Sequence, residues 1–254
     1  MPTRLFDLNE RVALVTGASR GIGEATARLL AEQGAHVVLA SRKQDDLDRI
    51  AAQIVAAGGH ATAIAAHQGD PGALEHLVQR IASEHGRLDI LVNNAATNPH
   101  FGHITDTDPG MIDKPLQVHI KGCFQPCSLA ARMMRGQGGG AIVNVASING
   151  LSPGMFRGIY SVTKAAVINM TRAFARECAP WGVRANAVLP GLTDTRFAAA
   201  LTRDQAVLDR FLQQVPMQRV AQPAEIAPAI LYLASDAASY VTGTTLTVDG
   251  GHCA

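Results

Sequence analysis

The sequence VALVTGASRGIG at residues 12–23 decides the fold of this chain. It joins a short apolar run to a glycine-rich turn, and a helical pattern follows at once. Glycines at Gly17, Gly21 and Gly23 let the backbone approach a phosphate group without a clash from Cβ, and the free N–H groups of a helix N-terminus favour an anion. Their spacing is GxxxGxG rather than GxGxxG, and a purely structural turn can share it. Because the turn lies in the first strand and helix of the chain, it favours nucleotide binding.

The same alternation of short apolar runs and longer helical patterns continues along all 254 residues. Runs that are apolar on both faces are typical of parallel strands covered by helices on each side. We therefore predict one α/β domain over residues 1–254, a Rossmann-type doubly wound parallel sheet with helices on both faces. The expected strands are Val12–Thr16, His36–Ala40, Ala61–Ala65, Leu88–Val92, Ala141–Ala146, Val183–Leu189 and Thr244–Val248.

Helical patterns fill several of the segments between these runs. The longest departure from the alternation is 192–222, which follows a strand and carries apolar residues at helical spacing. Segments of this kind often cover an active site. We predict a substrate lid at about 192–222. Helices are expected at 23–33, 43–57, 72–85 and 160–179.

Composition excludes several classes of function. The formal net charge is +1 and the longest run of Lys or Arg is Arg42-Lys43, so the chain lacks the basic surface that nucleic acids or anionic membranes require. No run approaches the roughly 18 uninterrupted apolar residues of a membrane span. The cysteines have the spacing of neither a disulfide framework nor a zinc site, and His100 and His103 lack acidic or cysteine neighbours. We expect a cytoplasmic protein with no metal, no nucleic-acid partner and a small-molecule substrate.

The residues after the second expected strand indicate which dinucleotide is bound. An NAD enzyme usually places an acidic residue there to hold the ribose 2′-hydroxyl. This chain has Ser41 and Arg42 instead, and Arg20 lies in the glycine turn. A hydroxyl and two guanidinium groups match a 2′-phosphate, so we predict NADP(H), with NAD(H) as the alternative. A solvated helix start is the other explanation of Arg42.

Three further residues predict the chemistry. Tyr160 and Lys164 are four residues apart in a helical stretch and therefore project from one face, and Ser147 ends the fifth expected strand. A phenol is a poor base near neutral pH, but a neighbouring ammonium group and a cationic nicotinamide lower its pKa. Tyr160 is therefore a candidate proton shuttle. A Tyr-x-x-x-Lys pair alone is common in proteins, so it indicates catalysis only together with the motifs around it.

The order of these motifs resembles the standard short-chain dehydrogenase/reductase family over essentially the whole chain. The motifs are the glycine turn, Asn93-Asn94-Ala95, Ser147, Tyr160-x-x-x-Lys164, Pro190-Gly191 and the VDGG ending at residues 248–251. The resemblance implies a seven-stranded sheet, a homotetramer or homodimer, and hydride transfer between the nicotinamide and a carbonyl carbon.

The resemblance also implies residue roles. Tyr160 would exchange a proton with the substrate oxygen, Ser147 would orient that oxygen, and Lys164 would hold the nicotinamide ribose and lower the pKa of Tyr160. The expected cofactor-binding residues are Gly17, Ser19, Arg20, Gly21, Ile22, Gly23, Ser41, Arg42, His67, Gln68, Asn94, Ala95, Tyr160, Lys164, Pro190, Gly191, Thr193 and Thr195.

Two positions depart from the family pattern. The stretch VHIKG at residues 118–122 places His119 where the family has its fourth catalytic residue, an asparagine. The resemblance implies that the main-chain carbonyl of the asparagine holds a water molecule that connects to the lysine. The main-chain carbonyl of His119 can do the same. Three roles are open for the His119 imidazole: it weakens proton transfer through this water, it makes the reaction rate depend on pH near neutrality, or it only packs against its neighbours. His67 replaces the family's adenine-contacting aspartate, which leaves adenine contact open.

Three stretches on the substrate side resemble the carbonyl/retinal reductase branch of the family: NPHFG at residues 98–102, ING at 148–150 and SPG at 152–154. Residues expected to face the substrate are mostly apolar with no clustered Arg or Lys, so we predict an uncharged ketone or secondary alcohol. Two alternatives remain. One is a 3-oxoacyl thioester reductase, which a basic patch at the site mouth would support, and the other is a catalytically weakened nucleotide-binding regulator. The expected substrate residues are Asn98, Ile148, Asn149, Met155, Phe156 and Phe197.

Overall fold

Seven parallel strands form one sheet in the computed structural model, which describes residues 5–97, 100–198 and 205–254. The strand order is β3-β2-β1-β4-β5-β6-β7. The predicted doubly wound sheet is confirmed, and each expected strand is present within two residues of its predicted bounds. The strands are β1 (Val12–Thr16), β2 (His36–Ser41), β3 (His60–Ala65), β4 (Ile90–Asn93), β5 (Gly140–Val145), β6 (Val183–Pro190) and β7 (Thr245–Val248).

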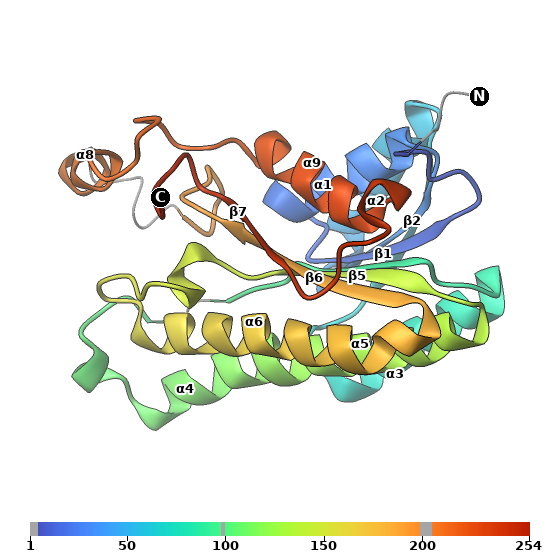
Figure 1. Cartoon of the computed structure of the whole chain (residues 1–254), viewed down its shortest axis with the longest axis horizontal. Helices are drawn as coiled ribbons and strands as arrows, with labels where there is room; N and C mark the ends of the chain where they lie inside the picture. The colour runs from blue at the N-terminus through green and yellow to red at the C-terminus, as the bar shows by residue number, and fades with distance from the viewer. Residues whose placement is uncertain (1–4, 98–99, 199–204) are drawn as a thin grey trace.

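Helices cover both faces of the sheet (Figure 1). One face carries α1 (Gly21–Glu32), α2 (Gln44–Ala56) and α9 (Pro223–Ala234). The other carries α3 (Pro71–His85), α4 (Pro109–Pro115), α5 (Gly122–Gly136) and α6 (Gly158–Cys178). A π-helical segment, Leu116–Lys121, joins α4 to α5, and α8 (Gln205–Leu212) lies apart, near the C-terminus. Among the described helices, none has the length and apolarity needed to cross a lipid bilayer.

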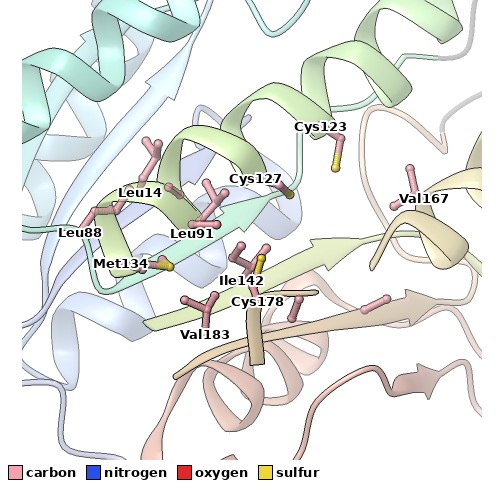
Figure 2. Packing of buried hydrophobic residues seen from close by; sticks show 14 of the residues in the cluster. Leu14, Leu88, Leu91, Cys123, Cys127, Met134, Ile142, Val167, Cys178 and Val183 are labelled. Carbon is pink, nitrogen blue, oxygen red and sulfur yellow. The ribbon is translucent and has the colours of Figure 1, made fainter. Parts of the chain in front are cut away.

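Alternate residues of the strands β1 to β6 enter two different hydrophobic cores. In β1, Leu14 faces α5 and α6, whereas Val15 faces the layer of α1, α2 and α9. Figure 2 shows the first core, where Leu14 and Ile142 of the sheet lie close to Cys127 of α5. Cys123 and Cys127 both lie in this core, with exposures of 5% and 0%.

The strand order places a binding site between β1 and β4. From β1 the chain proceeds to β2 and β3 on one side, and then returns to β4 on the other side. In doubly wound sheets, ligands bind outside the carboxyl ends of the strands at this point of reversal. Here those ends lead into the glycine turn after β1 and into Asn94 after β4.

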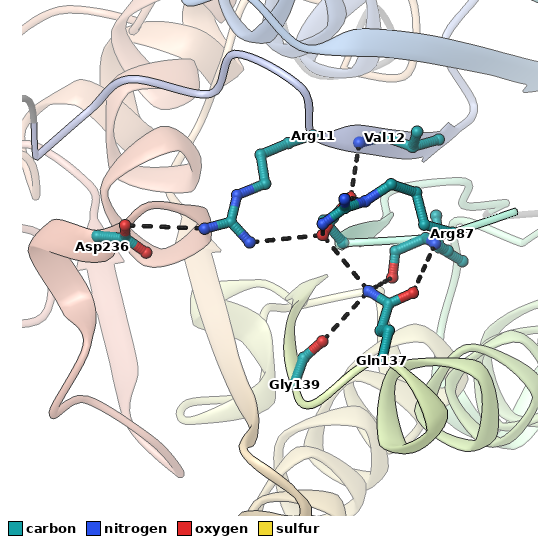
Figure 3. Close-up of polar contacts among 8 residues, drawn as sticks. Arg11, Val12, Arg87, Gln137, Gly139 and Asp236 are labelled. Carbon is teal, nitrogen blue, oxygen red and sulfur yellow. Dashed lines mark hydrogen bonds and ion pairs between the residues drawn. The ribbon is translucent and has the colours of Figure 1, made fainter. Parts of the chain in front are cut away.

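Asp89 joins three segments at the opposite, amino ends of β1 and β4. Its carboxylate is 3% exposed and accepts a hydrogen bond of 2.9 Å from the Val12 N–H (Figure 3). The Arg87 guanidinium donates two more at 2.7 and 2.8 Å, and Arg11 and Gln137 each lie at 3.4 Å. A carboxylate buried at this depth is stable because its lone pairs are occupied.

Replacing Asp89 by alanine is expected to lower the free energy of unfolding by about 2–3 kcal/mol, because the buried Val12 N–H loses its acceptor. Urea unfolding followed by circular dichroism measures the loss. Asp236→Ala is the matched control, since Asp236 is 71% exposed and meets Arg11 at 3.8 Å. An exposed pair of this kind contributes at most about 1 kcal/mol. Equal losses in the two variants would contradict the assignment.

Candidate functional site

A cleft of about 1360 Å³ opens at the carboxyl ends of the strands. Its lining comes from the segments that follow β1, β2, β3, β4, β5 and β6. The predicted site residues that the structure describes all line this cleft, except Gly23 and His119. Asn98 was also predicted, and it lies outside the described residues.

The glycine turn is packed too tightly for side chains. Gly17 and Gly21 have positive φ angles of 65° and 58°, which L side chains rarely adopt. A Cβ on Gly23 would overlap the Gly17 carbonyl oxygen and lie 2.5 Å from Asn94 Nδ2. A Cβ on Gly21 would lie 3.1 Å from Thr195 Cγ2, so Thr195, one of the predicted cofactor-binding residues, stands opposite the turn. The backbone of the turn and the start of α1 are left open to an anion.

Asn94 shapes this turn from the end of β4. Its amide Nδ2 donates to the Thr16 and Gly17 carbonyls at 3.1 and 3.2 Å, while its backbone N–H donates to Thr16 Oγ1 at 3.1 Å. The side chain predicted to bind the cofactor is therefore occupied in fixing the turn. Asn94 acts on the site by holding the glycine loop against β4.

The end of β2 fits a phosphate group. Ser41 Oγ is buried and, among the described residues, has no hydrogen-bond partner. Arg42 and Arg20 line the same cleft, and neither guanidinium makes an ion pair or hydrogen bond within the described part of the chain. An unpartnered hydroxyl beside two free guanidiniums is the donor set that a 2′-phosphate requires.

Of the two predicted cofactor-binding residues that follow β3, one has an exposed side chain at the cleft and the other has a buried one. His67 is exposed at the lining, and its Nδ1 accepts a hydrogen bond of 2.9 Å from the Gly69 N–H. The Gln68 side chain is instead buried, and its amide donates to the Gly122 carbonyl. The Gln68 side chain therefore fastens the segment after β3 to the start of α5, and the prediction that Gln68 contacts the cofactor stays a prediction.

The structure brings Ser147, Tyr160 and Lys164 together. Ser147 follows β5, and the other two lie one turn apart on α6; all three are buried. Lys164 Nζ donates to the Val145 carbonyl at 2.8 Å and lies 5.7 Å from the centre of the Tyr160 ring. Ser147 Oγ accepts a hydrogen bond of 3.2 Å from the Asn149 N–H, which fixes the hydroxyl at the cleft.

Burial sets the proton state of the Tyr160 and Lys164 pair. Burial raises the pKa of Tyr160, and the Ser147 hydroxyl and Arg157 guanidinium oppose that rise. Burial also lowers the pKa of Lys164 to about 8, because an ammonium group is costly to desolvate. At neutral pH the site therefore holds a neutral phenol, which can give a proton, beside a cation that can stabilise the phenolate.

Comparisons with known proteins agree with this geometry. A family model described as enoyl-(acyl carrier protein) reductase matches residues 17–252. Dehydrogenase/reductase SDR family member 4 of Oryctolagus cuniculus is 40% identical over 98% of this chain and 96% of its own. The chain belongs to the short-chain dehydrogenase/reductase family. Cis-4-hydroxycyclohexanecarboxylate dehydrogenase of Sinomonas cyclohexanicum is 41% identical over 96% of this chain and 97% of its own.

Solved structures of short-chain dehydrogenases share the whole fold. A gluconate 5-dehydrogenase from Burkholderia cenocepacia, in complex with NADP and tartrate, has a TM-score of 0.95 and 31% identity over 98% of both chains. A 7α-hydroxysteroid dehydrogenase in complex with NADH and a 7-oxo bile acid has a TM-score of 0.94 and 29% identity, covering 99% of this chain and 97% of its own. This chain is thus an oxidoreductase that uses a nicotinamide cofactor.

His119, where the family has asparagine, is a buried neutral side chain behind the cleft. Its Nε2 accepts a hydrogen bond of 2.9 Å from the Thr97 N–H, so its Nδ1 carries the proton and donates to Thr163 Oγ1 at 2.8 Å. Thr163 Oγ1 in turn donates to the Tyr160 carbonyl at 2.8 Å. The ring also meets the Tyr160 ring edge-on at 5.7 Å. His119 therefore ties the segment after β4 to the turn of α6 that carries Tyr160.

Of the three alternatives for the His119 imidazole, its burial favours packing over titration near neutral pH. Burial, and secondarily the nearby Lys164 charge, lower the pKa of His119 to about 2. Below about pH 6.5 the unfolded chain binds a proton at His119 that the folded chain excludes. Stability therefore falls by up to about 1.4 kcal/mol per pH unit on acidification.

His119→Asn is expected to leave the inflections of the pH–rate profile in place between pH 6 and 9, because the replaced imidazole stays neutral there. The same variant is expected to lose less stability than the wild type between pH 6.5 and 5, for which urea unfolding at each pH is the measurement. Disappearance of a rate inflection near pH 6.5 in the variant would show that His119 does titrate in the working enzyme.

The substrate side contains cations that sequence reasoning missed. Lys114, Arg157, Arg196 and Arg210 line the cleft together with the predicted Ile148, Asn149, Met155, Phe156 and Phe197. The cleft as a whole is therefore richer in Arg and Lys than the expected substrate residues indicated. These cations come from four separate segments, so only the fold brings them together. The signal available in the sequence was the position of Arg157, three residues before Tyr160.

The predicted lid segment borders the cleft. Thr193 forms an isolated bridge with Ala221, which closes the segment at its base, and the Phe197 ring lies 5.6 Å from the Tyr160 ring. Phe211 of α8 stacks on His252 at 5.0 Å. Residues 199–204 of the predicted lid lie outside the described part of the chain. Closure over a substrate stays a prediction.

Proposed function

We propose that this enzyme transfers a hydride between NADP(H) and the carbonyl carbon of a ketone, or the matching secondary alcohol. The observation that carries the proposal is the convergence of Ser147, Tyr160 and Lys164 beside the glycine turn at one end of the sheet. Ile148, Met155 and Phe156 supply apolar surface for the body of the substrate.

Each residue has a role in the reduction. The bound nicotinamide supplies the hydride that adds to the carbonyl carbon. The Tyr160 phenol gives its proton to the carbonyl oxygen, so the carbonyl becomes an alcohol and the phenol becomes a phenolate. The Ser147 hydroxyl donates a hydrogen bond to that oxygen and holds it in place. Lys164 binds the ribose, and its ammonium group stabilises the phenolate until a proton returns from solvent. Oxidation of the alcohol reverses these steps.

The preference for NADP(H) is supported by the donor set at the end of β2. Arg42→Leu is expected to weaken NADPH binding about 10-fold to 100-fold, the worth of one hydrogen-bonded charged contact, and to change NADH binding by less than about 3-fold. Fluorescence titration of each cofactor measures this without turnover. Arg49→Leu on the exposed side of α2 is the control of equal charge. If Arg42→Leu weakened the binding of NADPH and NADH equally, Arg42 would not bind the 2′-phosphate.

An assay of the purified protein with NADPH and a panel of ketones tests the reaction itself. Loss of absorbance on adding a ketone is the expected result. Tight NADPH binding with no turnover of any member would instead favour the nucleotide-binding regulator. The same assay with NADH tests the cofactor preference in turnover, and light scattering tests the homotetramer or homodimer expected from the family.

A 3-oxoacyl thioester reductase is the second candidate. Arg196 and Arg210 are exposed at the cleft, and exposed cations beside a site mouth suit an acidic acyl carrier. Acetoacetyl-coenzyme A is the probe to add to the panel. Turnover of this thioester well above that of simple ketones would favour the second candidate.

A further inference from the structure

The cleft holds more cations than a nicotinamide dinucleotide uses. Within its described lining, Asp46 is the one carboxylate, in a chain whose net charge is only +1. The proposed function uses Arg20, Arg42 and Lys164 at the cofactor end, next to Lys43. The remaining cations are Lys114, Arg157, Arg196 and Arg210.

Arg157 is the cation best placed to meet a substrate. It is the residue before α6, and its guanidinium carbon lies 5.9 Å from the ring centres of both Tyr160 and Phe101. Among the described residues it has no carboxylate partner and no hydrogen-bond acceptor for its side chain. Burial lowers the pKa of Arg157, although not enough to remove its charge. A half-buried guanidinium is thus held between two rings with its donors free.

A turn fixed by backbone hydrogen bonds sets the position of Arg157. Phe156 has a φ angle of +62°, a conformation that costs energy for a bulky side chain. The Phe156 carbonyl accepts a hydrogen bond of 3.1 Å from the Gly102 N–H, and the Arg157 N–H donates to the Gly154 carbonyl at 3.2 Å. These contacts maintain a strained turn at the cleft, and such turns are common where a residue is fixed for function.

We propose that Arg157 binds a carboxylate on the substrate, so that the preferred substrates are oxo acids and the matching hydroxy acids. The inference rests on the proposed function, because it takes the reacting oxygen to lie at the Tyr160 hydroxyl. A guanidinium offers two parallel N–H donors that match the two oxygens of a carboxylate. Its closeness to Tyr160 places the carboxylate near the reacting carbonyl, and the Phe101 and Phe156 rings, 5.9 Å apart, border the same cleft.

Matched pairs of ketones test this inference. The wild type is assayed with NADPH on 4-oxocyclohexanecarboxylate and 4-oxopentanoate, each beside its methyl ester. We expect kcat/KM to be at least about 10-fold higher for each acid, the worth of one charged hydrogen-bonded contact. Arg157→Leu is expected to abolish this preference by lowering kcat/KM for the acids alone, and Arg157→Lys to restore part of it. Arg135→Leu, whose guanidinium lies over Trp181 away from the cleft, is the control of equal charge.

Two results would overturn the inference while leaving the proposed function intact. One is equal turnover of acids and esters by the wild type. The other is an equal loss on both in Arg157→Leu together with a shifted pH profile, which would mean that Arg157 acts on Tyr160 instead. Failure of every ketone would overturn the proposed function itself. Thermal unfolding with NADPH and unreactive cyclohexanecarboxylate gives a readout without turnover: stabilisation of the wild type but not of Arg157→Leu supports the carboxylate site.

Discussion

Tyr160→Phe is expected to lower kcat/KM about 1000-fold for every ketone that the wild type reduces, within the range known for lost acid–base catalysis. The variant removes one oxygen atom and keeps the ring. That ring packs against His119 at 5.7 Å and Phe197 at 5.6 Å, so the cleft keeps its shape. The Ser147 hydroxyl can still orient the carbonyl oxygen, but no group remains to give it a proton. NADPH affinity is expected to change little.

Initial-rate assays at saturating NADPH measure kcat/KM for the ketone, and fluorescence titration measures cofactor binding. Tyr240→Phe is the matched control, because its fully exposed hydroxyl lies outside the cleft lining. Its activity is expected to equal that of the wild type. If Tyr160→Phe kept more than about a tenth of the wild-type rate, a different group would have to supply the proton.

The sheet was predictable from the sequence, whereas several helices were not. Most of the strands are apolar on both faces, and that pattern does not depend on which strands lie beside them. By contrast, α4, α5 and α9 contain Pro115, Pro126 and Pro228 within their bounds. Proline usually ends a helix, so the sequence pattern around these three prolines does not predict a continuous helix. The π-helical segment after Pro115 has no signal of its own in the sequence.

The positions of the site residues were predictable, but the directions of their side chains were not. Asn94 and Gln68 occupy the expected edge of the sheet, yet their amides bond to the glycine turn and to Gly122. The proton state of His119 follows from burial, which the residue type does not reveal. Arg157 enters the cleft only because the turn at Phe156 brings it there.

Lys164→Met is expected to make the fold more stable while lowering kcat/KM about 100-fold or more, since it removes the cation that stabilises the phenolate. The folded chain holds Lys164 at a pKa of about 8, compared with an ordinary 10.5. This difference corresponds to about 3 kcal/mol of destabilisation at neutral pH. The lost hydrogen bond to the Val145 carbonyl offsets about 1 kcal/mol of the gain. A net stabilisation of about 2 kcal/mol without cofactor is the expected result.

The dependence of this gain on pH distinguishes it from better packing by methionine. Between pH 8 and 10.5 the unfolded chain keeps a proton on Lys164 that the folded chain has released, so the wild type becomes more stable as the pH rises through this window. The advantage of Lys164→Met should therefore shrink between pH 8 and 10, as urea unfolding at each pH will show. Lys121→Met, at an exposed position, is the control. A constant advantage, or a variant less stable than the wild type at pH 7, would mean that Lys164 is not held at a cost to the fold. A shrinking advantage would show that the Lys164 ammonium destabilises the fold, and a simultaneous loss of kcat/KM would show that the reaction requires it.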